Sequence, residues 1–412
     1  MIGEILIEIK DKKKCCGCSA CVSICPQKCI KMVPDEEGFL YPYVNKDLCI
    51  GCGLCERNCP VKNAKAPNGS PKAVIVRNID EKILRDSTSG GAFTAFATAL
   101  IKEKNAIVYG AAFDENFMVK HVGVNSVEDL WKFRGSKFVQ SEINGLFECI
   151  KEQLASGRTV LFSGTPCQIS ALKIFLGSKY TENLYCCDIV CRGVPSPLLW
   201  KEYIKWIENK FGSKIKNIKF RNKTYGYHSS TMFVEFQNSR IYKKSGRIDP
   251  MMRLFTKEMC SRPSCSECSF KTKQRVSDLT MFDCKRYEKL TGKSDDDKGY
   301  TALLIQSQKG RELLEMASSQ LSIESIDADR LIEQCGVMVY GRAKQNPKRN
   351  AVFEEIKDKS IEQIAIDLCN IGFKDKSIEY LKSFLYVTGL IKIARRIKKH
   401  EVISIDLGEN SK

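Results

Sequence analysis

The sequence predicts an α+β protein in which a small cysteine-rich module precedes a larger mixed α/β domain. Ten of the 21 cysteines lie before residue 60 and recur at regular spacings. A polar segment, 66–71, follows them, and beyond it short apolar runs alternate with helical patterns. The length of 412 residues corresponds to about two or three domains at roughly 150 residues each.

The composition is that of a globular protein from a reducing compartment. Apolar residues make up 43% and charged residues 28% of the chain, which argues against wholesale disorder. No segment approaches the ~20 consecutive apolar residues of a membrane span, and residues 1–14 lack the apolar run of a signal peptide. We therefore expect a cytoplasmic protein. Because such a compartment does not sustain a disulfide scaffold, metal ligation is the simplest explanation of the cysteines.

Residues 1–66 contain an internal duplication. The pattern Cys-x2-Cys-x2-Cys-x3-Cys-Pro occurs twice, first from Cys15 to Pro26 and again from Cys49 to Pro60. Three closely spaced thiolates can hold three corners of a [4Fe–4S] cluster, and the cysteine before proline then reaches the other cluster. On this reasoning two clusters are held, one by Cys15, Cys18, Cys21 and Cys59, the other by Cys49, Cys52, Cys55 and Cys25.

Zinc is the alternative metal for this module. Zinc sites typically use separated cysteine pairs, often with histidine, whereas the first histidine of this chain is His121. The duplicated pattern favours iron–sulfur clusters and resembles bacterial two-cluster ferredoxins. Cys16 and Cys29 fall outside the pattern, and we expect them to be free thiols. The module is therefore predicted to be a ferredoxin-type 2[4Fe–4S] domain.

A linker, 67–79, leads to the larger domain, 80–350, in which helices and strands alternate. We expect helices at 91–104, from 167 or 168 onward, at 198–211 and at 309–319. Strands are expected at 106–113, 159–162, 184–190 and 301–306, and alternating runs at 215–221, 231–236 and 239–243 predict antiparallel strands. Residues 351–412 are predicted to form a helical, basic C-terminal region.

Two segments of the larger domain suit an anionic ligand. Ser89, Gly90 and Gly91 precede a predicted helix, where free backbone N–H groups can bind a phosphate, although an ordinary helix cap is the more frequent explanation. The segment 134–141 combines cations, small residues and an amide, which suits a flavin's polar edge or a plain surface turn. The candidate cofactor contacts are Arg134, Gly135, Ser136, Lys137, Gln140 and Ser141 here, and Thr165 farther along the chain.

Four cysteines of the larger domain form a further candidate ligand set. Cys167 follows Thr165 at the start of a predicted helix, where the pKa of a thiol is lowered. Cys191 precedes a loop rich in proline, and Cys265 and Cys268 form a Cys-x2-Cys pair. Together these four thiolates are enough for a third cluster, with Cys187, Cys260 and Cys284 as nearby competitors.

The order of these motifs resembles the coenzyme F420 hydrogenase/dehydrogenase beta-subunit family. The segments that carry the resemblance are Ser-Gly-Gly at 89–91, Gly-Ser-Lys-Phe-Val-Gln-Ser at 135–141, Gly-Thr-Pro-Cys-Gln at 164–168, and Cys-x-Gly-Val-Pro-Ser-Pro at 191–197. It implies an iron–sulfur flavoprotein with FAD beside a third cluster at Cys167, Cys191, Cys265 and Cys268. It also implies electron transfer with an organic substrate, in some members for surface-polysaccharide synthesis.

The chain departs from the family pattern close to the implied flavin. Phe282 stands where family members carry glycine, Lys285 stands near the usual tryptophan, and Arg192 replaces a common histidine. The substrate is therefore not assumed to be coenzyme F420. No residue is assigned as a nucleophile or other catalytic group.

The net charge of +17 indicates the class of partner. Residues 201–275 hold 18 Lys or Arg against 6 Asp or Glu, so +12 of the charge lies there. This favours an anionic cofactor, an anionic small-molecule substrate or a ferredoxin-like redox donor. Nucleic acid is not expected because no nucleic-acid-binding motif accompanies the charge.

The C-terminal region leaves two interpretations open. Residues 384–394 are largely apolar and lead into a basic run, 395–399. This helix either packs on the domain or contacts an anionic membrane surface peripherally.

Two functions follow from the sequence. The first is an oxidoreductase that passes electrons from a ferredoxin-type donor through [4Fe–4S] clusters and FAD to an organic substrate, or in the reverse direction. The second is a non-catalytic electron-transfer subunit of a larger oxidoreductase complex.

Overall fold

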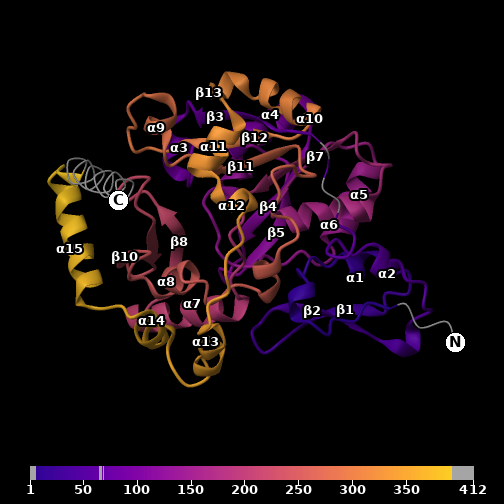
Figure 1. Ribbon diagram of the computed structural model, residues 1–412, viewed down its shortest axis with the longest axis horizontal. Helices are drawn as coiled ribbons and strands as arrows, with labels where there is room; N and C mark the ends of the chain where they lie inside the picture. Colours follow the sequence, from indigo (N-terminus) through magenta and orange to yellow (C-terminus); the bar gives the residue numbers. More distant parts are fainter. Residues whose placement is uncertain (1–5, 65–66, 68, 392–412) are drawn as a thin grey trace, which may run out of the picture.

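The computed structural model describes residues 6–64, 67 and 69–391, arranged as a cysteine-rich module beside a larger domain with two sheets (Figure 1). In the module, β1 (Ile30–Pro34) pairs antiparallel with β2 (Leu40–Val44). Two short helices, α1 (Ala20–Ile24) and α2 (Leu54–Arg57), begin within the two cysteine motifs. Two 3-10 turns, η1 (Lys12–Lys14) and η2 (Lys46–Leu48), precede those motifs.

An eight-stranded mixed sheet organises the larger domain, in the order β13-β3-β12-β11-β7-β6-β4-β5. The central pairs β11–β7, β7–β6 and β6–β4 are parallel, and the outer pairs are antiparallel. The strands are β3 (Lys72–Asn78), β4 (Ile107–Phe113), β5 (Val119–Val124), β6 (Val160–Gly164), β7 (Leu184–Ile189), β11 (Leu279–Asp283), β12 (Thr301–Ile305) and β13 (Leu321–Ile326).

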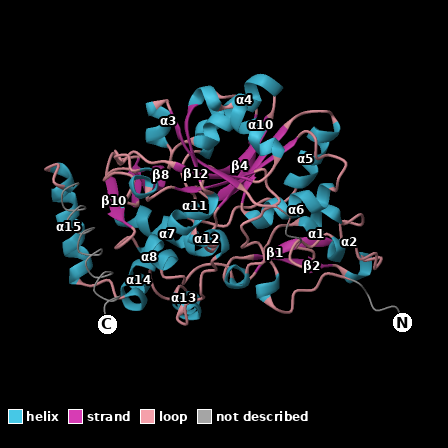
Figure 2. Ribbon diagram, turned by 45° about the horizontal axis from the view of Figure 1, so that its top comes forward, coloured by secondary structure: helices cyan, strands magenta, loops and turns pink. Residues whose placement is uncertain are grey.

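Helices cover both faces of this sheet (Figure 2). Leu161 of β6 and Leu303 of β12 face α4 (Ala92–Lys104) and α10 (Gln308–Met316). Their neighbours Phe162 and Leu304 point the other way, as strand alternation requires. On that second face lie α5 (Leu146–Ala155), α6 (Pro166–Leu176), α9 (Tyr287–Thr291), α11 (Ala328–Cys335) and α12 (Val337–Tyr340). Shorter elements are α3 (Glu81–Asp86), η3 (Glu128–Phe133) and η5 (Ser318–Gln320).

A second core surrounds Trp200, which is fully buried. It joins a three-stranded antiparallel sheet to a group of helices. The strands are β8 (Ile215–Asn222), β9 (Thr231–Phe236) and β10 (Ile241–Ser245). The helices are α7 (Pro197–Phe211), α8 (Pro250–Thr256), α13 (Arg349–Glu355) and α14 (Ile361–Cys369); η4 (Pro263–Glu267) follows α8 and α15 (Phe373–Val387) follows α14.

The structure confirms the α+β class and its ferredoxin-like N-terminal module, but it corrects one boundary. The expected linker, 67–79, contains β3, which lies between β13 and β12 in the large sheet. Its run from Ala73 to Val76 is buried on both faces, so it lacks the alternation that marks a half-exposed strand. β5, β11 and β13 were likewise not predicted. Residues 392–400 of the predicted C-terminal helix lie outside the described residues.

Contacts between the module and the larger domain include one at α1 and one at the turn between β1 and β2. α1 lies on α5 and α6, where Ser19 Oγ donates to Asn144 Oδ1 at 2.5 Å. In the turn between β1 and β2, the Glu37 carboxylate accepts hydrogen bonds from both terminal nitrogens of Arg349, and the Nη1–Oε1 distance is 2.6 Å. Across the described ranges, no helix is both long and apolar enough to cross a membrane.

Candidate metal centres

The duplicated motif has the same backbone in both halves of the module. Gly17 and Gly51 adopt positive φ values of 69° and 66° at corresponding positions. Ser19 and Gly53, with φ of 58° and 68°, are the N-caps of α1 and α2. A Cβ on Gly17 would lie 2.6 Å from Nε2 of Gln140, so this position requires glycine for space as well as for its φ angle. Each motif thus turns tightly and presents its thiols to one side.

The thiols of the two motifs line two separate cavities. One cavity contains Cys15, Cys18, Cys21 and Cys59, together with Cys16. The other contains Cys49, Cys52, Cys55 and Cys25, together with Cys29. The fourth cysteine of each motif therefore lies with the three cysteines of the other half, which is the crossed arrangement that the spacing predicts. The two cavities have equal volumes of about 20 Å³.

A third cavity, about 40 Å³, lies where the larger domain meets the module. Its thiols are Cys167, Cys191, Cys265 and Cys268, joined by Cys16. Sequence reasoning did not include Cys16, whose thiol is hydrogen-bonded to that of Cys167. The sequence gives only that Cys16 directly follows Cys15, and this does not show toward which cavity its side chain points.

Local structure explains how these four cysteines converge. Thr165 caps α6 in a capping box with Gln168, which places Cys167 in the first turn, 3.1 Å from Thr165 Oγ1. Cys191 follows the end of β7, and Cys265 and Cys268 lie in and after η4. A Cβ on Gly193 would lie 2.8 Å from Ser261 Oγ, so the two loops approach closely only because this residue is small.

The competing cysteines lie elsewhere. Cys187 is buried in the core beneath α4, and Cys260 is buried in the core around Trp200. Cys284 is hydrogen-bonded to Cys335 at the side of the sheet covered by α11. None of these three lines the third cavity.

The donor chemistry of the three cavities suits iron–sulfur clusters. Burial raises the pKa of the Cys15 thiol, and the nearby Arg262 guanidinium lowers it. Burial also raises the pKa of Cys191 to about 12. Binding of metal would therefore release protons from these thiols. Among the described residues, no three His, Cys, Asp or Glu side chains are arranged to hold a single metal ion.

The residues expected to bind the flavin's anionic groups fall into two places. Gln140, Ser141 and Thr165 adjoin the cysteines: Gln140 Nε2 donates to the carbonyl of Cys16 at 3.1 Å, and Gln168 Nε2 donates to Ser141 Oγ at 3.0 Å. Ser89, Gly90 and Gly91 lie before α4 instead. There Ser89 Oγ donates to the Tyr300 carbonyl, and Gly90 N donates to Thr301 Oγ1 at 3.0 Å.

Two cations of the segment 134–141 form no ion pair within the described part of the chain. The Nε atom of Arg134 is buried without a hydrogen bond. Lys137 Nζ donates to the carbonyls of Arg134 and Gly135, both at 3.4 Å, and lies over the ring of Phe113. No carboxylate of the described residues forms an ion pair with Lys137. Burial lowers the pKa of Lys137 to about 7. Ser136 N donates to Thr88 Oγ1 at 2.8 Å, which holds this loop beside the start of α4.

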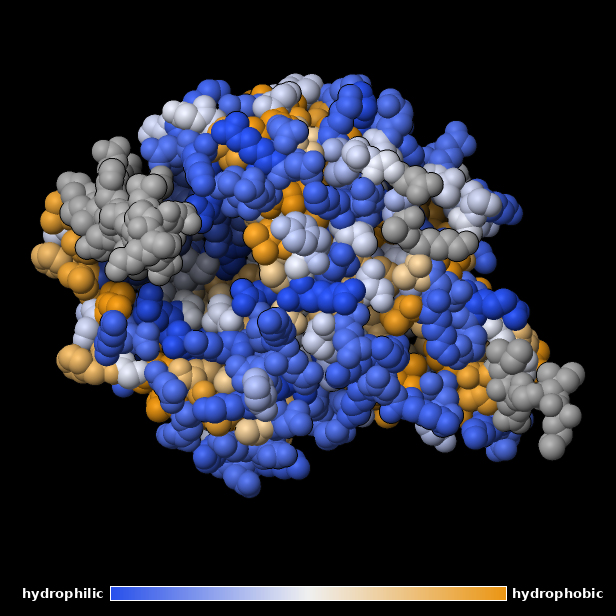
Figure 3. Space-filling model, viewed as in Figure 1, coloured by the Kyte–Doolittle hydropathy of each residue, from blue (hydrophilic) through white to orange (hydrophobic). Residues whose placement is uncertain are grey.

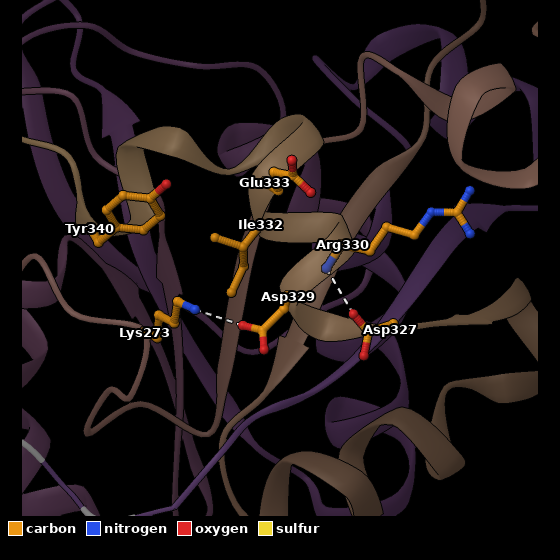
Figure 4. A pocket seen from close by; sticks show the side chains of 7 residues that line it. All are labelled: Lys273, Asp327, Asp329, Arg330, Ile332, Glu333 and Tyr340. Atoms are coloured by element: carbon orange, nitrogen blue, oxygen red, sulfur yellow. Dashed lines mark hydrogen bonds and ion pairs between the residues drawn. The ribbon is translucent and has the colours of Figure 1, made fainter.

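Part of the positive charge of the basic segment 201–275 is neutralised in the structure by ion pairs. Several of its cations pair with carboxylates outside the segment, as Lys210 does with Glu362 and Arg221 with Asp283. A charged hollow beside α11 is similarly self-paired (Figure 4): Lys273 Nζ lies 2.6 Å from Asp329 Oδ1, and Asp327 caps the helix. No cysteine lines this hollow.

Comparison with known proteins agrees with the two-part organisation. Residues 14–63 match the model of the 4Fe-4S dicluster domain, and residues 157–330 match the model of the C terminus of the coenzyme F420 hydrogenase/dehydrogenase beta subunit. Among solved structures, a chain of the F420-reducing [NiFe] hydrogenase complex from Methanosarcina barkeri is 18% identical, with a TM-score of 0.43. That alignment covers 77% of this chain and 94% of the other. No curated protein matches.

Proposed function

We propose that the protein is an iron–sulfur flavoprotein oxidoreductase. It passes electrons between a ferredoxin-like partner and an organic substrate. The proposal is supported by the match of residues 14–63 to a 4Fe-4S dicluster domain and of residues 157–330 to the C terminus of the coenzyme F420 hydrogenase/dehydrogenase beta subunit. The observation that carries the proposal is the set of three thiol-lined cavities, two in the module and one where the module meets the larger domain.

The cavities suggest an order for the electron path. When bound, [4Fe–4S] clusters supply one-electron carriers. Cys16 and Val61 line both the first module cavity and the third cavity, so these two adjoin. The cavity with Cys49, Cys52 and Cys55 shares none of its lining residues with the third, and the exposed Cys52 faces solvent there. We assign this cavity to the entry site for the external redox partner.

Iron content tests the third site. Cys265→Ser is expected to lower the bound iron from about twelve to about eight atoms per chain, because one of three four-iron clusters loses a ligand. The measurement is iron and acid-labile sulfide analysis of anaerobically purified protein. Cys149→Ser, at an exposed cysteine of α5, is the control and should retain all the iron. Equal iron in wild type and Cys265→Ser would contradict a third cluster held by these cysteines.

The unpaired cations fit the phosphates of FAD. Arg134, Ser136 and Lys137 would hold them beside the start of α4, close to Ser89 and Gly91. Bound FAD would supply the step between one-electron carriers and a two-electron substrate. The role of the protein here is to provide fixed positive charge and to exclude water.

The pH dependence of FAD binding tests this assignment. Lys137 has a pKa of about 7 without a ligand and must carry a proton to pair with a phosphate. FAD affinity should therefore fall as the pH rises from 6 to 9. Lys137→Met should weaken binding roughly tenfold at pH 6 and remove this pH dependence, since a charge-assisted hydrogen bond is lost. Lys132→Met, at a lysine paired with Asp129 on the surface, is the control. A Lys137→Met protein that binds FAD as wild type does would exclude the site.

A peripheral membrane contact is favoured by the outer face of α15. Phe373, Tyr380, Phe384 and Val387 follow helical spacing and are 87%, 72%, 61% and 83% exposed. The opposite face is fixed to the domain, where the buried Glu379 accepts from Ser245 N at 2.7 Å. Apolar surface is visible at the left edge of Figure 3, where Figure 1 places α15. The exposed Lys374 and Lys376 flank the stripe, and the sequence continues with five cations between 392 and 399.

Vesicle co-sedimentation tests this contact. Wild-type protein should sediment with vesicles that contain anionic lipid and not with purely zwitterionic vesicles. Phe384→Asp combined with Val387→Asp should abolish sedimentation, because the apolar stripe is lost. Ile241→Asp, at an exposed apolar residue of β10, is the matched control. Sedimentation that is unaffected by the double substitution would assign α15 to another contact, such as a protein partner.

A further inference from the structure

Arg262 is the most buried cation of the described residues and lies between the module and the third cavity. Its side chain is 1% exposed. It follows the short bridge between Pro195 and Ser261, and its backbone N donates to the Val194 carbonyl at 2.9 Å. It also lines the third cavity beside Cys265. The protein therefore places a full positive charge at the boundary between two thiol sites.

The guanidinium is held in one orientation by the module. Its Nε donates to the Cys15 carbonyl at 2.7 Å, and its Nη2 donates to the Leu40 carbonyl at 2.9 Å. Nη1 donates to Gln140 Oε1 at 3.1 Å. Nη2 also lies 3.5 Å from the Cys15 sulfur, and the group stacks over the Tyr41 ring at 4.2 Å from its centroid.

Two other arginines are almost as buried, and both have a carboxylate partner. Arg275 lies 2.9 Å from Asp188, and Arg349 forms a two-pronged pair with Glu37. Arg262 has no ion pair with any Asp or Glu of the described residues. A buried charge without an opposite charge is strongly disfavoured. The sulfur of Cys15 is the group beside it that becomes anionic when a metal binds.

We propose that Arg262 is the counter-charge of the cluster held by Cys15, Cys18, Cys21 and Cys59. It raises the reduction potential of this cluster above that of the distal module cluster, which is held by Cys49, Cys52, Cys55 and Cys25. This inference rests on the proposed function. Reduction adds one electron to a centre that thiolates already make negative, and a fixed cation beside it favours the reduced form. The duplicated half offers a comparison: Cys49, which corresponds to Cys15, has no described arginine hydrogen-bonded to its sulfur.

The test is a redox titration of the reduced clusters followed by electron paramagnetic resonance under anaerobic conditions. Arg262→Gln should leave the midpoint potential of the distal module cluster unchanged and lower that of the cluster held by Cys15, Cys18, Cys21 and Cys59. We expect at least a tenfold change in its reduction equilibrium, which is about 59 mV for a one-electron couple. Arg262→Lys should lower this midpoint potential less than Arg262→Gln does, because lysine keeps the positive charge and loses only the planar, several-donor geometry of the guanidinium.

The matched control removes a charge pair from the same interface. Glu37→Met with Arg349→Met takes away one positive and one negative charge and should leave both potentials unchanged. If Arg262→Gln binds the same iron as wild type and both midpoints stay in place, the inference is wrong while the proposed function stands. If Arg262→Gln fails to assemble its clusters, the wild-type protein decides, and equal midpoint potentials for the two module clusters there are equally contradictory. Wild-type protein without clusters would overturn the proposed function itself.

Discussion

Cys59→Ser is expected to remove the cluster next to the larger domain and to leave the distal cluster intact. Cys59 belongs by sequence to the second motif, but it lines the cavity of Cys15, Cys18 and Cys21. Loss of a thiolate ligand should cost about four iron atoms per chain. Because that cavity adjoins the third one, electrons from an external donor should no longer reach the larger domain. The measurements are iron analysis and the rate of substrate-site reduction by a ferredoxin-like donor.

The control for this substitution lies within the same module. Cys29 is 6% exposed and Cys59 is 7% exposed, so both serine substitutions bury a hydroxyl at a comparable place. Cys29→Ser should keep all the iron, because the motif leaves Cys29 without a ligand role. Cys25→Ser should remove the distal cluster instead. If Cys59→Ser removed the distal cluster, the crossed ligand assignment would be incorrect.

Arg349→Met is expected to give the largest loss of stability among single contacts between the module and the C-terminal region. Arg349 donates to both oxygens of the buried Glu37 carboxylate and to the Ser261 carbonyl at 2.9 Å. Removing one partner leaves a buried charge unpaired, which costs about 3–5 kcal/mol in the free energy of unfolding. Urea unfolding of the anaerobic holoprotein, followed by tryptophan fluorescence, to which the buried Trp200 contributes, measures the change.

The double variant separates the charge from the packing. Glu37→Met with Arg349→Met should recover most of the stability, since apolar replacement of both members of a buried pair is often neutral. A double variant that is less stable than Arg349→Met would show that the pair contributes through its hydrogen bonds rather than through an unpaired charge.

The sequence predicted the parts of the fold that have strong local signals. β9 was predicted as residues 231–236 and is Thr231–Phe236, because its apolar and polar residues alternate between two faces. Family models confirm the ferredoxin-type module and match the C terminus of the beta subunit over residues 157–330. The run of β3 was assigned to a linker, because a strand buried on both faces has no alternation and followed directly on a polar stretch.

The candidate site was predictable only where ligands are close in the sequence. The duplicated spacing indicates which cysteines act together, whereas Cys16 and Arg262 reach the third cavity through tertiary packing alone. Arg262 lies 247 residues from Cys15, and no local pattern relates them. Long-range electrostatic partners of this kind depend on how two domains dock, and a single sequence does not encode that docking in any short motif.

Quantitative analysis of iron, acid-labile sulfide and flavin in anaerobically purified protein tests the central claim most directly. The three cavities predict about twelve iron atoms per chain, and the unpaired cations beside α4 predict one FAD. If turnover of a candidate substrate then requires no other protein, the chain is an enzyme rather than a carrier within a larger complex. Zinc in place of iron, or about eight iron atoms with no flavin after reconstitution, would contradict the account.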